Sequence, residues 1–552
     1  MDYPKIPLAQ SILQICQAKG VTTVVISPGS RNAPLTIGFA SNPDFKCYSV
    51  ADERCAAFFA LGLAQQLKTP VALLCTSGSA VLNYYPAVAE AFYSQIPLVV
   101  ISADRPQSKI DIGDGQTIRQ QNVLKSHTLF CANLTEEASE ENDKKINKAI
   151  NRAISKKGPV HINAPFEEPL YETVNKYSVD AMIEGLPRKA SKLSVKDIMA
   201  ATNIWNVAKK KLILVGSLNP GEIAQEILEG WAKDPSIVVM TEVTSNLHQP
   251  TFASRIDTLI TAFGQKEFRD FRPDVLITFG GMVVSKRIKA FLRSYKPDQH
   301  WHIDPLRAYD TFGALSHHFK VEPAHFFEAI SPFAKAVKSN YSAKAAQLLE
   351  YRGNRHDVFT ASAPYSDFTV YEKILSALPE NRLLHISNSA AIRYAQLFPM
   401  KQQVDVFCNR GTSGIDGSSS TAVGASVASD KPTVLITGDI GFLYDSNALW
   451  NNYIPSDFKI VIVNNGGGGI FRILPGHSET PVFNTFFETS HHLTAENLAK
   501  MYGFNYRNAA DPKQLESELN DFYTSGQKEI LEVFTPEKEN DKVLKDYFEA
   551  LA

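Results

Sequence analysis

Two polar pairs in the last third of the chain have the residue types and the spacing of a metal site. Gly438 and Asp439 end the apolar run TVLIT, and Asn464 and Asn465 end the apolar run KIVIV. Asp439 and Asn465 are 26 positions apart, which is room for one crossover between adjacent parallel strands, so their side chains should reach the same sheet edge. Carboxylate, amide and backbone carbonyl oxygens suit Mg²⁺, and phosphate oxygens complete its octahedron.

Four glycines, 466–469, follow the second pair. Glycine lets the backbone bend freely and approach a diphosphate closely. The simplest alternative is a pair of unrelated turns at strand ends, where Asp and Asn-Gly are common. We interpret the segment 433–471 as a site for Mg²⁺ and a diphosphate.

These strand ends belong to an alternation of strands and helices that runs through the whole chain. β-Branched runs such as TTVVIS, PLVVISAD, KLILVG, DVLITFGG, NRLLHISNS and TVLITGD alternate with helical stretches, which is the pattern of parallel sheets wrapped by helices. Polar segments at about 172–196 and 334–366 separate three sets of strands. We therefore predict an α/β protein with three domains, at 1–175, 190–335 and 360–552, each of ordinary size and each built on a mainly parallel sheet.

The composition excludes several kinds of partner. Lys plus Arg number 56 against 58 Asp plus Glu, and no long basic run occurs, so we expect no nucleic acid partner. The start of the chain has no secretory pattern, and the apolar runs are too short to span a membrane. Six cysteines without a Cys-x-x-Cys pair indicate buried thiols in a reducing cytoplasm, rather than disulfides or a zinc site.

The segment 433–471 resembles the diphosphate-binding signature of the thiamine-diphosphate enzymes. One departure is Ile440, because the family often has Gly directly after the Asp. These enzymes also need a carboxylate against the aminopyrimidine ring of the cofactor. Glu53 matches it, because it lies between a strand-like run, CYSV, and an apolar helix, AAFFALGLA. The alternative is that Asp52 and Glu53 are acids at a helix start, favoured by the helix dipole.

Further segments narrow the resemblance to one family. SPGSRNAPL (27–35), ADERCAAFFALGLA (51–64), TSGSAVLNYYPAVAEA (76–91), ADRP (103–106), DGQTIRQ (114–120) and NRGTSGIDG (409–417) are together similar to the synthases of 2-succinyl-5-enolpyruvyl-6-hydroxy-3-cyclohexene-1-carboxylate (SEPHCHC) in menaquinone biosynthesis. The resemblance covers all three domains. It implies a transferase that uses thiamine diphosphate to decarboxylate 2-oxoglutarate and to add the succinyl carbanion equivalent to isochorismate.

The resemblance implies a cofactor site with named residues. Glu53 would activate the cofactor, and Asp439, Asn465 and the Gly467 carbonyl would hold Mg²⁺ or Mn²⁺. Ile415 matches the apolar residue that holds thiamine in its bent form, and Ile470 would also contact the cofactor. In relatives the cofactor lies between the first domain of one subunit and the last domain of another, so we expect at least a homodimer.

The resemblance also implies a set of substrate-binding residues. Both substrates are dicarboxylates, so the site needs several cations, and Arg offers bidentate contacts. The residues expected near isochorismate are Ser30, Arg31, Arg105 and Gln116. Those expected near the carboxylate derived from 2-oxoglutarate are Ser389, Arg393 and Arg410. Lys286 and Arg287 would bring the middle domain to the pocket, and Ile470, Phe471 and Leu474 would form its apolar wall.

Two other functions remain open from the sequence. A thiamine enzyme with other substrates, such as an acetohydroxyacid synthase or a simple 2-oxo acid decarboxylase, would share the cofactor motif. The first usually has flavin in a longer middle domain, and the second typically has a pair of catalytic His residues, which we do not find here. A non-catalytic nucleotide-binding protein is the other alternative, but GSLNPGE (216–222) lacks the Gly-x-Gly-x-x-Gly fingerprint.

Overall fold

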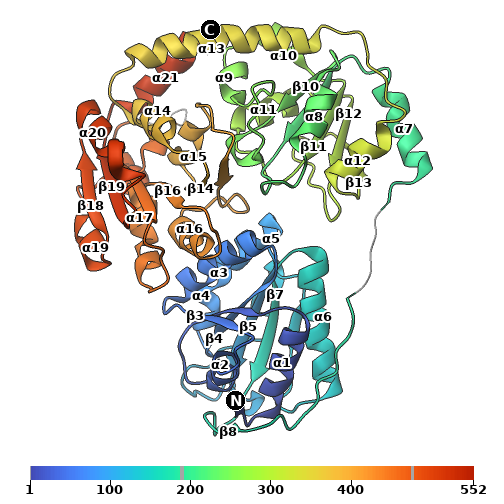
Figure 1. Cartoon of the computed structure of the whole chain (residues 1–552), viewed down its shortest axis with the longest axis vertical. Coiled ribbons are helices and arrows are strands. Elements are labelled where there is room, and N and C mark those ends of the chain that lie inside the picture. The colour runs from blue at the N-terminus through green and yellow to red at the C-terminus, as the bar shows by residue number, and fades with distance from the viewer. Residues whose placement is uncertain (1, 187–191, 474–477) are drawn as a thin grey trace.

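The computed structural model describes residues 2–186, 192–473 and 478–552, and its framework is three parallel sheets wrapped by helices (Figure 1). This arrangement confirms the predicted α/β fold class. The central strands are apolar and buried, as expected when helices cover both faces of a parallel sheet, whereas several strands at sheet edges carry polar, partly exposed residues. We call the parts built on these sheets the N-terminal, middle and C-terminal units.

The N-terminal unit has the strand order β3-β2-β4-β5-β7-β6. Its strands are β2 (Thr23–Ile26), β3 (Lys46–Ser49), β4 (Val71–Cys75), β5 (Leu98–Asp104), β6 (Cys131–Asn133) and β7 (Val160–Pro165). Its helices are α1 (Pro7–Ala18), α2 (Ala33–Ala40), α3 (Glu53–Leu67), α4 (Ala80–Asn83), α5 (Tyr85–Ser94), α6 (Glu140–Lys156) and the 3-10 turns η1 (Gln107–Lys109) and η2 (Lys125–His127). Two short strands, β1 (Tyr3–Pro4) and β8 (Thr173–Val174), pair antiparallel beside it.

The middle unit has the strand order β10-β9-β11-β12-β13. Its strands are β9 (Lys211–Val215), β10 (Ile237–Met240), β11 (Val275–Phe279), β12 (Gln299–Ile303) and β13 (Leu315–Phe319). Its helices are α7 (Val195–Trp205), α8 (Gln225–Ala232), η3 (Val243–Ser245), α9 (Ile256–Ile260), α10 (Gln265–Phe271), α11 (Lys286–Ser294) and α12 (Pro323–Ile330).

The C-terminal unit has the strand order β15-β14-β16-β17-β19-β18. Its strands are β14 (Arg382–Ile386), β15 (Val404–Phe407), β16 (Thr433–Gly438), β17 (Lys459–Asn464), β18 (Asn505–Ala509) and β19 (Glu529–Phe534). Its main helices are α14 (Asp367–Ala377), α15 (Ala390–Ala395), α16 (Ser418–Val427), α17 (Asp439–Tyr444), α19 (Glu496–Met501), α20 (Pro512–Phe522) and α21 (Asn540–Ala550). Shorter turns are η4 (Ser446–Leu449), η5 (Gly469–Ile473), α18 (Pro481–Phe483) and the π-turn η6 (Asn484–Glu488).

The N-terminal and C-terminal sheets have the same topology. Numbered within each unit, both run 2-1-3-4-6-5 through the described strands. The strand order reverses between β2 and β4 in the first unit and between β14 and β16 in the last. Loops at the carboxyl ends of strands around such a switch point form the binding crevice of open α/β sheets. The fold therefore places one crevice in each of these units.

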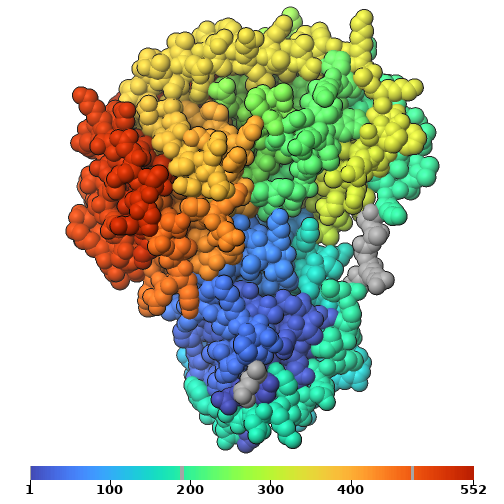
Figure 2. Space-filling model, in the orientation of Figure 1, coloured from blue at the N-terminus to red at the C-terminus, as the bar shows by residue number. Residues whose placement is uncertain are grey.

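The N-terminal and C-terminal units pack on each other through helices α3 and α16. Glycines allow this close approach: a Cβ on Gly62 would lie 2.1 Å from the Thr421 carbonyl oxygen, and one on Gly424 would lie 2.0 Å from that of Phe59. Buried side chains of both helices share one hydrophobic cluster. Figure 2 shows the N-terminal unit in blue, in contact with the orange part of the C-terminal unit above it.

The segment 334–366 differs from its prediction as a polar connector. It contains α13 (Tyr341–Ser362), a helix of 22 residues that crosses the top of both the middle and the C-terminal units (Figure 1). Only Tyr341, Ala345, Arg352 and His356 are buried along it. A helix with so narrow a buried stripe has little apolar periodicity, although its Ala, Lys, Gln, Leu and Glu residues favour helix.

The described residues include no helix that is both long and apolar enough to cross a membrane.

Candidate active site

The predicted metal ligands meet at the carboxyl ends of β16 and β17. Asp439 begins α17 and is 4% exposed, and Asn465 directly follows β17 and is 9% exposed. Asp439 Oδ2 accepts a hydrogen bond of 2.9 Å from the Gly467 backbone nitrogen. The adjacent parallel strands therefore bring these three residues together, in the way that the spacing of the two motifs predicted.

The residues present fit a divalent cation that a diphosphate helps to hold. Asn465 Nδ2 donates to Asp367 Oδ2 at 2.9 Å, whereas Asn465 Oδ1 is buried and has no hydrogen-bond partner in the described part of the chain. A buried oxygen without a partner is costly unless a ligand satisfies it. No group of three or more His, Cys, Asp or Glu side chains suited to a metal occurs within residues 2–186, 192–473 and 478–552, so a metal here needs amide, carbonyl and phosphate oxygens as well.

The glycine loop passes so close to another segment that side chains are excluded. Gly467 has φ +155°, and a Cβ there would lie 2.7 Å from the Glu488 carbonyl oxygen. The Gly468 backbone nitrogen donates to that same oxygen at 2.5 Å. Glu488 is itself buried against the Arg472 guanidinium, with 2.5 Å between Oε2 and Nη2. This buried ion pair fixes the segment against which the glycine loop folds.

Three neighbours of the metal ligands were not found from the sequence. They are Asp367, Glu488 and His491, whose Nε2 lies 3.4 Å from Asp439 Oδ2. That contact raises the pKa of His491. Burial raises the pKa of Asp367 to about 6, partly offset by hydrogen bonds from Thr535 and Asn465. Each lies in a segment distant along the chain from the residue that it contacts, so local pattern gives no signal for it.

The predicted apolar residues lie beside this site. Ile415 is half-buried, and a Cβ on Gly441 in α17 would lie 3.9 Å from its Cβ. Ile470 and Phe471 belong to η5, directly after the glycine loop. Phe471 is 36% exposed. Leu474, the remaining member of the predicted apolar wall, lies outside the described residues.

Glu53 occupies the first turn of α3 at the junction of two units. Asp52 caps the helix by accepting from the Cys55 backbone nitrogen at 3.2 Å, so the helix-start interpretation holds for Asp52. Glu53 is half-buried, and its Oε2 accepts from Asn83 Nδ2 at 3.4 Å. The neighbouring Arg54 donates to the Tyr444 carbonyl at 2.8 Å. The helix that starts with Asp439 thus ends, at Tyr444, against the helix that carries Glu53.

One group of predicted substrate residues gathers at the carboxyl ends of the strands β2, β5 and β7 in the N-terminal sheet. Arg31 is buried; its Nη1 donates to the Phe166 carbonyl at 2.9 Å and its Nη2 to Glu168 Oε1 at 3.1 Å. Burial and the nearby Arg105 lower the pKa of Arg31. Arg105 Nη2 donates to the Gly115 carbonyl at 3.2 Å, next to Gln116. Ser30 and Gln116 are exposed at the rim.

A second cationic group joins the middle unit to the C-terminal unit. Arg410 Nη1 donates to Asn388 Oδ1 at 2.7 Å. Burial lowers the pKa of Arg393, and Arg410 acts in the same direction, which places the two guanidinium groups close together. Ser389, at the start of α15, has φ +72°, a strained conformation of the kind that clusters at functional sites.

The Lys286-Arg287 pair begins α11 and is exposed. The Arg287 guanidinium lies 4.3 Å from the centre of the Phe548 ring in α21. Burial raises the pKa of Asp257, and the nearby Arg287 and Arg393 oppose that rise. Arg287 and Arg393 therefore both lie near Asp257, and the contribution of Lys286 and Arg287 to the substrate pocket stays a prediction.

Two further carboxylates of the middle unit, Glu242 and Asp257, lie behind this group and were not singled out from the sequence. Glu242 follows β10 in the segment VVMTEV, where a buried acid directly after an apolar run was the available signal. A cavity of about 560 Å³ opens between the middle unit and the other two, and its lining includes Lys289, Arg410 and Gly411. Substrate-sized space therefore adjoins Arg410 of the second cationic group, whereas Arg287 and Arg393 do not line this cavity.

Comparison with known proteins gives the family. Three family models match the chain in succession: the N-terminal TPP binding domain of thiamine pyrophosphate enzymes over residues 6–127, the middle domain of thiamine pyrophosphate over 187–386, and the C-terminal TPP binding domain over 389–533. The chain is 63% identical to the SEPHCHC synthases of Flavobacterium johnsoniae and of Flavobacterium psychrophilum, over 100% of both chains in each case. It is 51% identical to that of Christiangramia forsetii over 99% of both chains. The chain therefore belongs to the SEPHCHC synthase family of thiamine-diphosphate (thiamine pyrophosphate) enzymes.

Proposed function

We propose that this protein decarboxylates 2-oxoglutarate and adds the succinyl carbanion equivalent to isochorismate, giving SEPHCHC and CO₂ in menaquinone biosynthesis. One observation carries the proposal beyond the family name. Two separate cationic groups lie in the described part of the chain, one with Arg31 and Arg105 in the N-terminal unit, the other with Arg287, Arg393 and Arg410. Two dicarboxylate substrates need two such groups, because an arginine at each carboxylate offsets its loss of hydration.

The C-terminal unit would hold the diphosphate end of the cofactor. Asp439, the free Oδ1 of Asn465 and the Gly467 carbonyl would bind Mg²⁺ or Mn²⁺ together with the diphosphate. When bound, thiamine diphosphate supplies the electron sink that lets a 2-oxo acid lose CO₂ and become a nucleophile. Asp367 holds the Asn465 amide in the orientation that leaves Oδ1 free.

Glu53 would move the proton that activates the cofactor. Its half-buried carboxylate belongs to the first turn of α3. The Asp52 cap and the Arg54 contact to Tyr444 hold the backbone of that turn in place. Such a carboxylate contributes as a general acid or base only while it stays within hydrogen-bond reach of its partner. Ile415 would exclude water from the cofactor, and Ile470, Phe471 and Leu474 would form the apolar wall toward the acceptor.

We also propose a cytoplasmic homo-oligomer with its active sites between subunits. Apolar side chains near the glycine loop remain uncovered in the single chain, with Phe486 77% exposed and Phe487 52% exposed. Ile112, close to the Arg105 group, is 67% exposed. Apolar side chains gathered beside a site favour a surface that another subunit covers.

The proposed domains are 1–175 for the pyrimidine end of the cofactor, 190–335 for the middle domain and 360–552 for the diphosphate end.

A turnover assay tests this proposal. Purified protein is supplied with Mg²⁺, thiamine diphosphate, 2-oxoglutarate and isochorismate, and the product is identified by mass. An adduct that retains the succinyl unit and requires thiamine diphosphate supports the proposal. Release of CO₂ without an adduct retains the thiamine chemistry and excludes isochorismate as acceptor. An adduct with an uncharged 2-oxo acid in place of isochorismate would favour an acetohydroxyacid-type enzyme.

A further inference from the structure

The loop that precedes α11 is held by a buried carboxylate. Glu242 is 1% exposed, and its two oxygens accept hydrogen bonds from consecutive backbone nitrogens, Val284 to Oε2 and Ser285 to Oε1, each at 2.7 Å. A carboxylate that accepts two backbone N–H groups fixes both the position and the direction of that loop. The next two residues are Lys286 and Arg287.

A second carboxylate acts on the same loop through Ser285. The Ser285 hydroxyl donates to Asp257 Oδ1 and accepts from the Ile288 backbone nitrogen at 3.1 Å. Ser285 is thereby the N-cap of α11, and Asp257 fixes the rotamer of its hydroxyl. Glu242 and Asp257 together determine where the first turn of α11, and so Lys286 and Arg287, point.

The charge balance around the two carboxylates leaves a surplus of cations. Arg287 and Arg393 act on Asp257, and Arg410 acts on Glu242. Lys289 lies near both Arg410 and Glu242. Glu90, which accepts from the Gly411 and Thr412 backbone nitrogens, adds a third carboxylate beside Arg410. Three carboxylates facing four cations, Arg287, Lys289, Arg393 and Arg410, still leave an excess positive charge that suits an anionic substrate.

We propose that Glu242 and Asp257 are positioning residues that hold Lys286 and Arg287, through the Ser285 cap, against one carboxylate of a dicarboxylate substrate. This inference rests on the proposed function and names residues that act on the substrate only through α11. A buried carboxylate is a costly way to satisfy two backbone N–H groups, because its charge loses hydration. The nearby cations offset that cost, so the carboxylates and the cationic group stabilise each other.

The pH dependence of Glu242 gives the proposal a distinctive readout. Burial raises the pKa of Glu242 to about 7, against the lowering effect of the two backbone N–H groups. Asp257 and Arg410 act on Glu242, and Glu242 in turn acts on Lys289 and Cys408. Protonation would place a hydrogen on one of the two accepting oxygens. The loop would then lose one of its two bonds as the pH falls through about 7.

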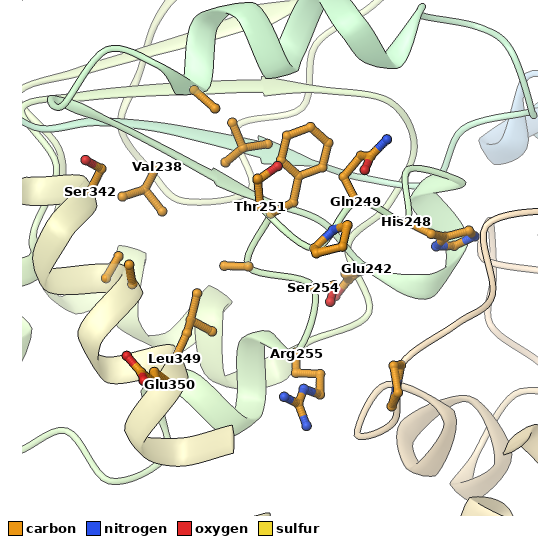
Figure 3. A pocket seen from close by; sticks show the side chains of 18 of the residues that line it. Val238, Glu242, His248, Gln249, Thr251, Ser254, Arg255, Ser342, Leu349 and Glu350 are labelled. Atoms are coloured by element: carbon orange, nitrogen blue, oxygen red, sulfur yellow. The ribbon is translucent and has the colours of Figure 1, made fainter. Parts of the chain in front are cut away.

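The surroundings of Glu242 decide which substitution to use. Glu242 lines a pocket of about 740 Å³ between the loop 248–255 and α13, and its lining does not include Val284 or Ser285. Figure 3 shows Glu242 near Ser254, with Leu349 and Glu350 of α13 across the pocket. A shorter side chain would admit water that could satisfy both amides. Glu242→Gln keeps the side-chain volume. Its NH₂ group would face one of the two backbone N–H donors, so one of the two hydrogen bonds to the loop would be lost.

The experiment compares Glu242→Gln, Asp257→Asn and a matched control. Asp310→Asn is the control, because the Asp310 carboxylate also accepts two backbone N–H groups of the middle unit, at 2.8 and 2.9 Å, but is exposed. We expect Glu242→Gln to raise KM for one of the two substrates at least fivefold, with KM for the other within twofold and kcat within threefold. In the wild type, the KM that Glu242→Gln raises should itself rise as the pH falls below 7, because Glu242 is then protonated. Glu242→Gln should not show this dependence on pH. Asp257→Asn should give a smaller shift in the same KM.

Hydrogen exchange separates this inference from the proposed function. Succinate, a dicarboxylate, should slow amide exchange in the segment 284–290 of the wild type and not in Glu242→Gln, whether or not the protein turns over. Unchanged KM values for both substrates in Glu242→Gln would overturn the proposal, with or without a loss of kcat. Absence of succinate protection in the wild type would also overturn it. Failure of wild-type turnover with succinate protection intact would overturn only the proposed reaction.

Discussion

The Asn465 amide nitrogen donates a hydrogen bond of 2.9 Å to Asp367 Oδ2, and the buried amide oxygen of Asn465 has no partner among the described residues. The two residues are 98 positions apart, and Asp367 begins α14. An amide can point either atom toward a site, and a carboxylate behind its nitrogen selects the orientation that presents the oxygen. The affinity for the metal and the cofactor should therefore depend on a residue that touches neither.

Replacing Asp367 by Asn should weaken cofactor binding. The new NH₂ group would face that of Asn465, so the Asn465 amide would turn and present nitrogen to the metal. Partners of this kind typically contribute 10- to 100-fold in metal affinity, and we expect a rise of about tenfold or more in the Kd of thiamine diphosphate at fixed Mg²⁺, measured by calorimetric titration. Asp310→Asn is the control, and equal Kd values in the two variants would contradict the prediction.

Replacing Glu53 by Gln should abolish turnover without unfolding the protein. General acid–base groups contribute about 10²- to 10⁴-fold, so we expect kcat to fall at least about 100-fold, while thiamine diphosphate still binds and the melting temperature changes little. Glu172→Gln is a matched control, because Glu172 is an exposed carboxylate of the same unit paired with Lys5. Retained turnover in Glu53→Gln would leave Glu53 as a helix-start acid only.

Replacing Gly467 by Ala should disrupt the glycine loop and cofactor binding together. The added Cβ would lie 2.7 Å from the Glu488 carbonyl oxygen, and the Arg472 contact prevents Glu488 from moving away. Gly503→Ala is the control, because Gly503 has φ +72° but a Cβ there meets nothing within 4 Å. Both variants should melt at lower temperature, but only Gly467→Ala should raise the Kd of thiamine diphosphate, in the same titration.

Replacing Arg31 or Arg393 by Lys should affect the two substrates differently. Lysine retains the charge but not the bonds to the Phe166 carbonyl and Glu168 that hold the Arg31 guanidinium in place. A displaced side chain that loses one charged hydrogen bond to the substrate corresponds to about tenfold in affinity. We expect Arg31→Lys to raise KM for isochorismate about tenfold and to leave KM for 2-oxoglutarate within about twofold, with the reverse for Arg393→Lys. Arg119→Lys, at an exposed Arg paired with Asp111, should change neither. A shared effect of both variants on one substrate would contradict two separate groups.

Replacing Asp445 by Asn should alter how stability depends on pH. Burial raises the pKa of Asp445 to about 7, against hydrogen bonds from Ser420. The folded state therefore holds this proton at a pH where the unfolded state has released it, so the contribution of Asp445 to stability falls as the pH rises from about 4 to about 7. The fall is at most about 1.4 kcal/mol per pH unit. Melting temperatures measured from pH 4 to pH 8 should show the wild type losing stability relative to Asp445→Asn over that window and no further change above it.

The opposite sign would mean that Asp445 is ionised in the folded state and stabilised by Arg54. The control for this series is Asp180→Asn, since Asp180 is exposed and should leave the pH dependence of melting unchanged.

The sequence predicted the strands that helices cover on both faces and the edge strands β3, β10 and β15, but it missed the edge strands β6, β13 and β18. β16 and β17 are continuous apolar runs because both of their faces are buried. The strands β6, β13 and β18 each lie at the edge of a sheet and have the sequences CAN, LSHHF and NYRNA. These three strands expose more of their side chains than the apolar edge strand β10 does, so their polar residues hide them from a search for apolar runs.

In the candidate site, too, the sequence revealed the residues that local pattern marks and missed those that depend on distant contacts. Asp439 and Asn465 were found because each directly follows a buried strand, and the metal chemistry depends on that local position. Asp367, Glu242 and Asp257 act through contacts with residues far along the chain, and only the folded structure brings them together. Their roles could not be predicted from local pattern, although a charged residue after an apolar run, as at Glu242, is a usable signal.

The helix α13 makes the connection between the middle and C-terminal units sensitive to phase as well as to length. Each residue of an α-helix adds about 1.5 Å of rise and about 100° of rotation. One inserted residue in α13 would therefore rotate the middle unit, with Lys286 and Arg287, to a different side of the C-terminal unit. Insertion of a whole number of helical turns would nearly restore its orientation. Natural length variation in this segment should then follow the helical repeat, in steps near seven or eleven residues, rather than the free variation of an ordinary loop.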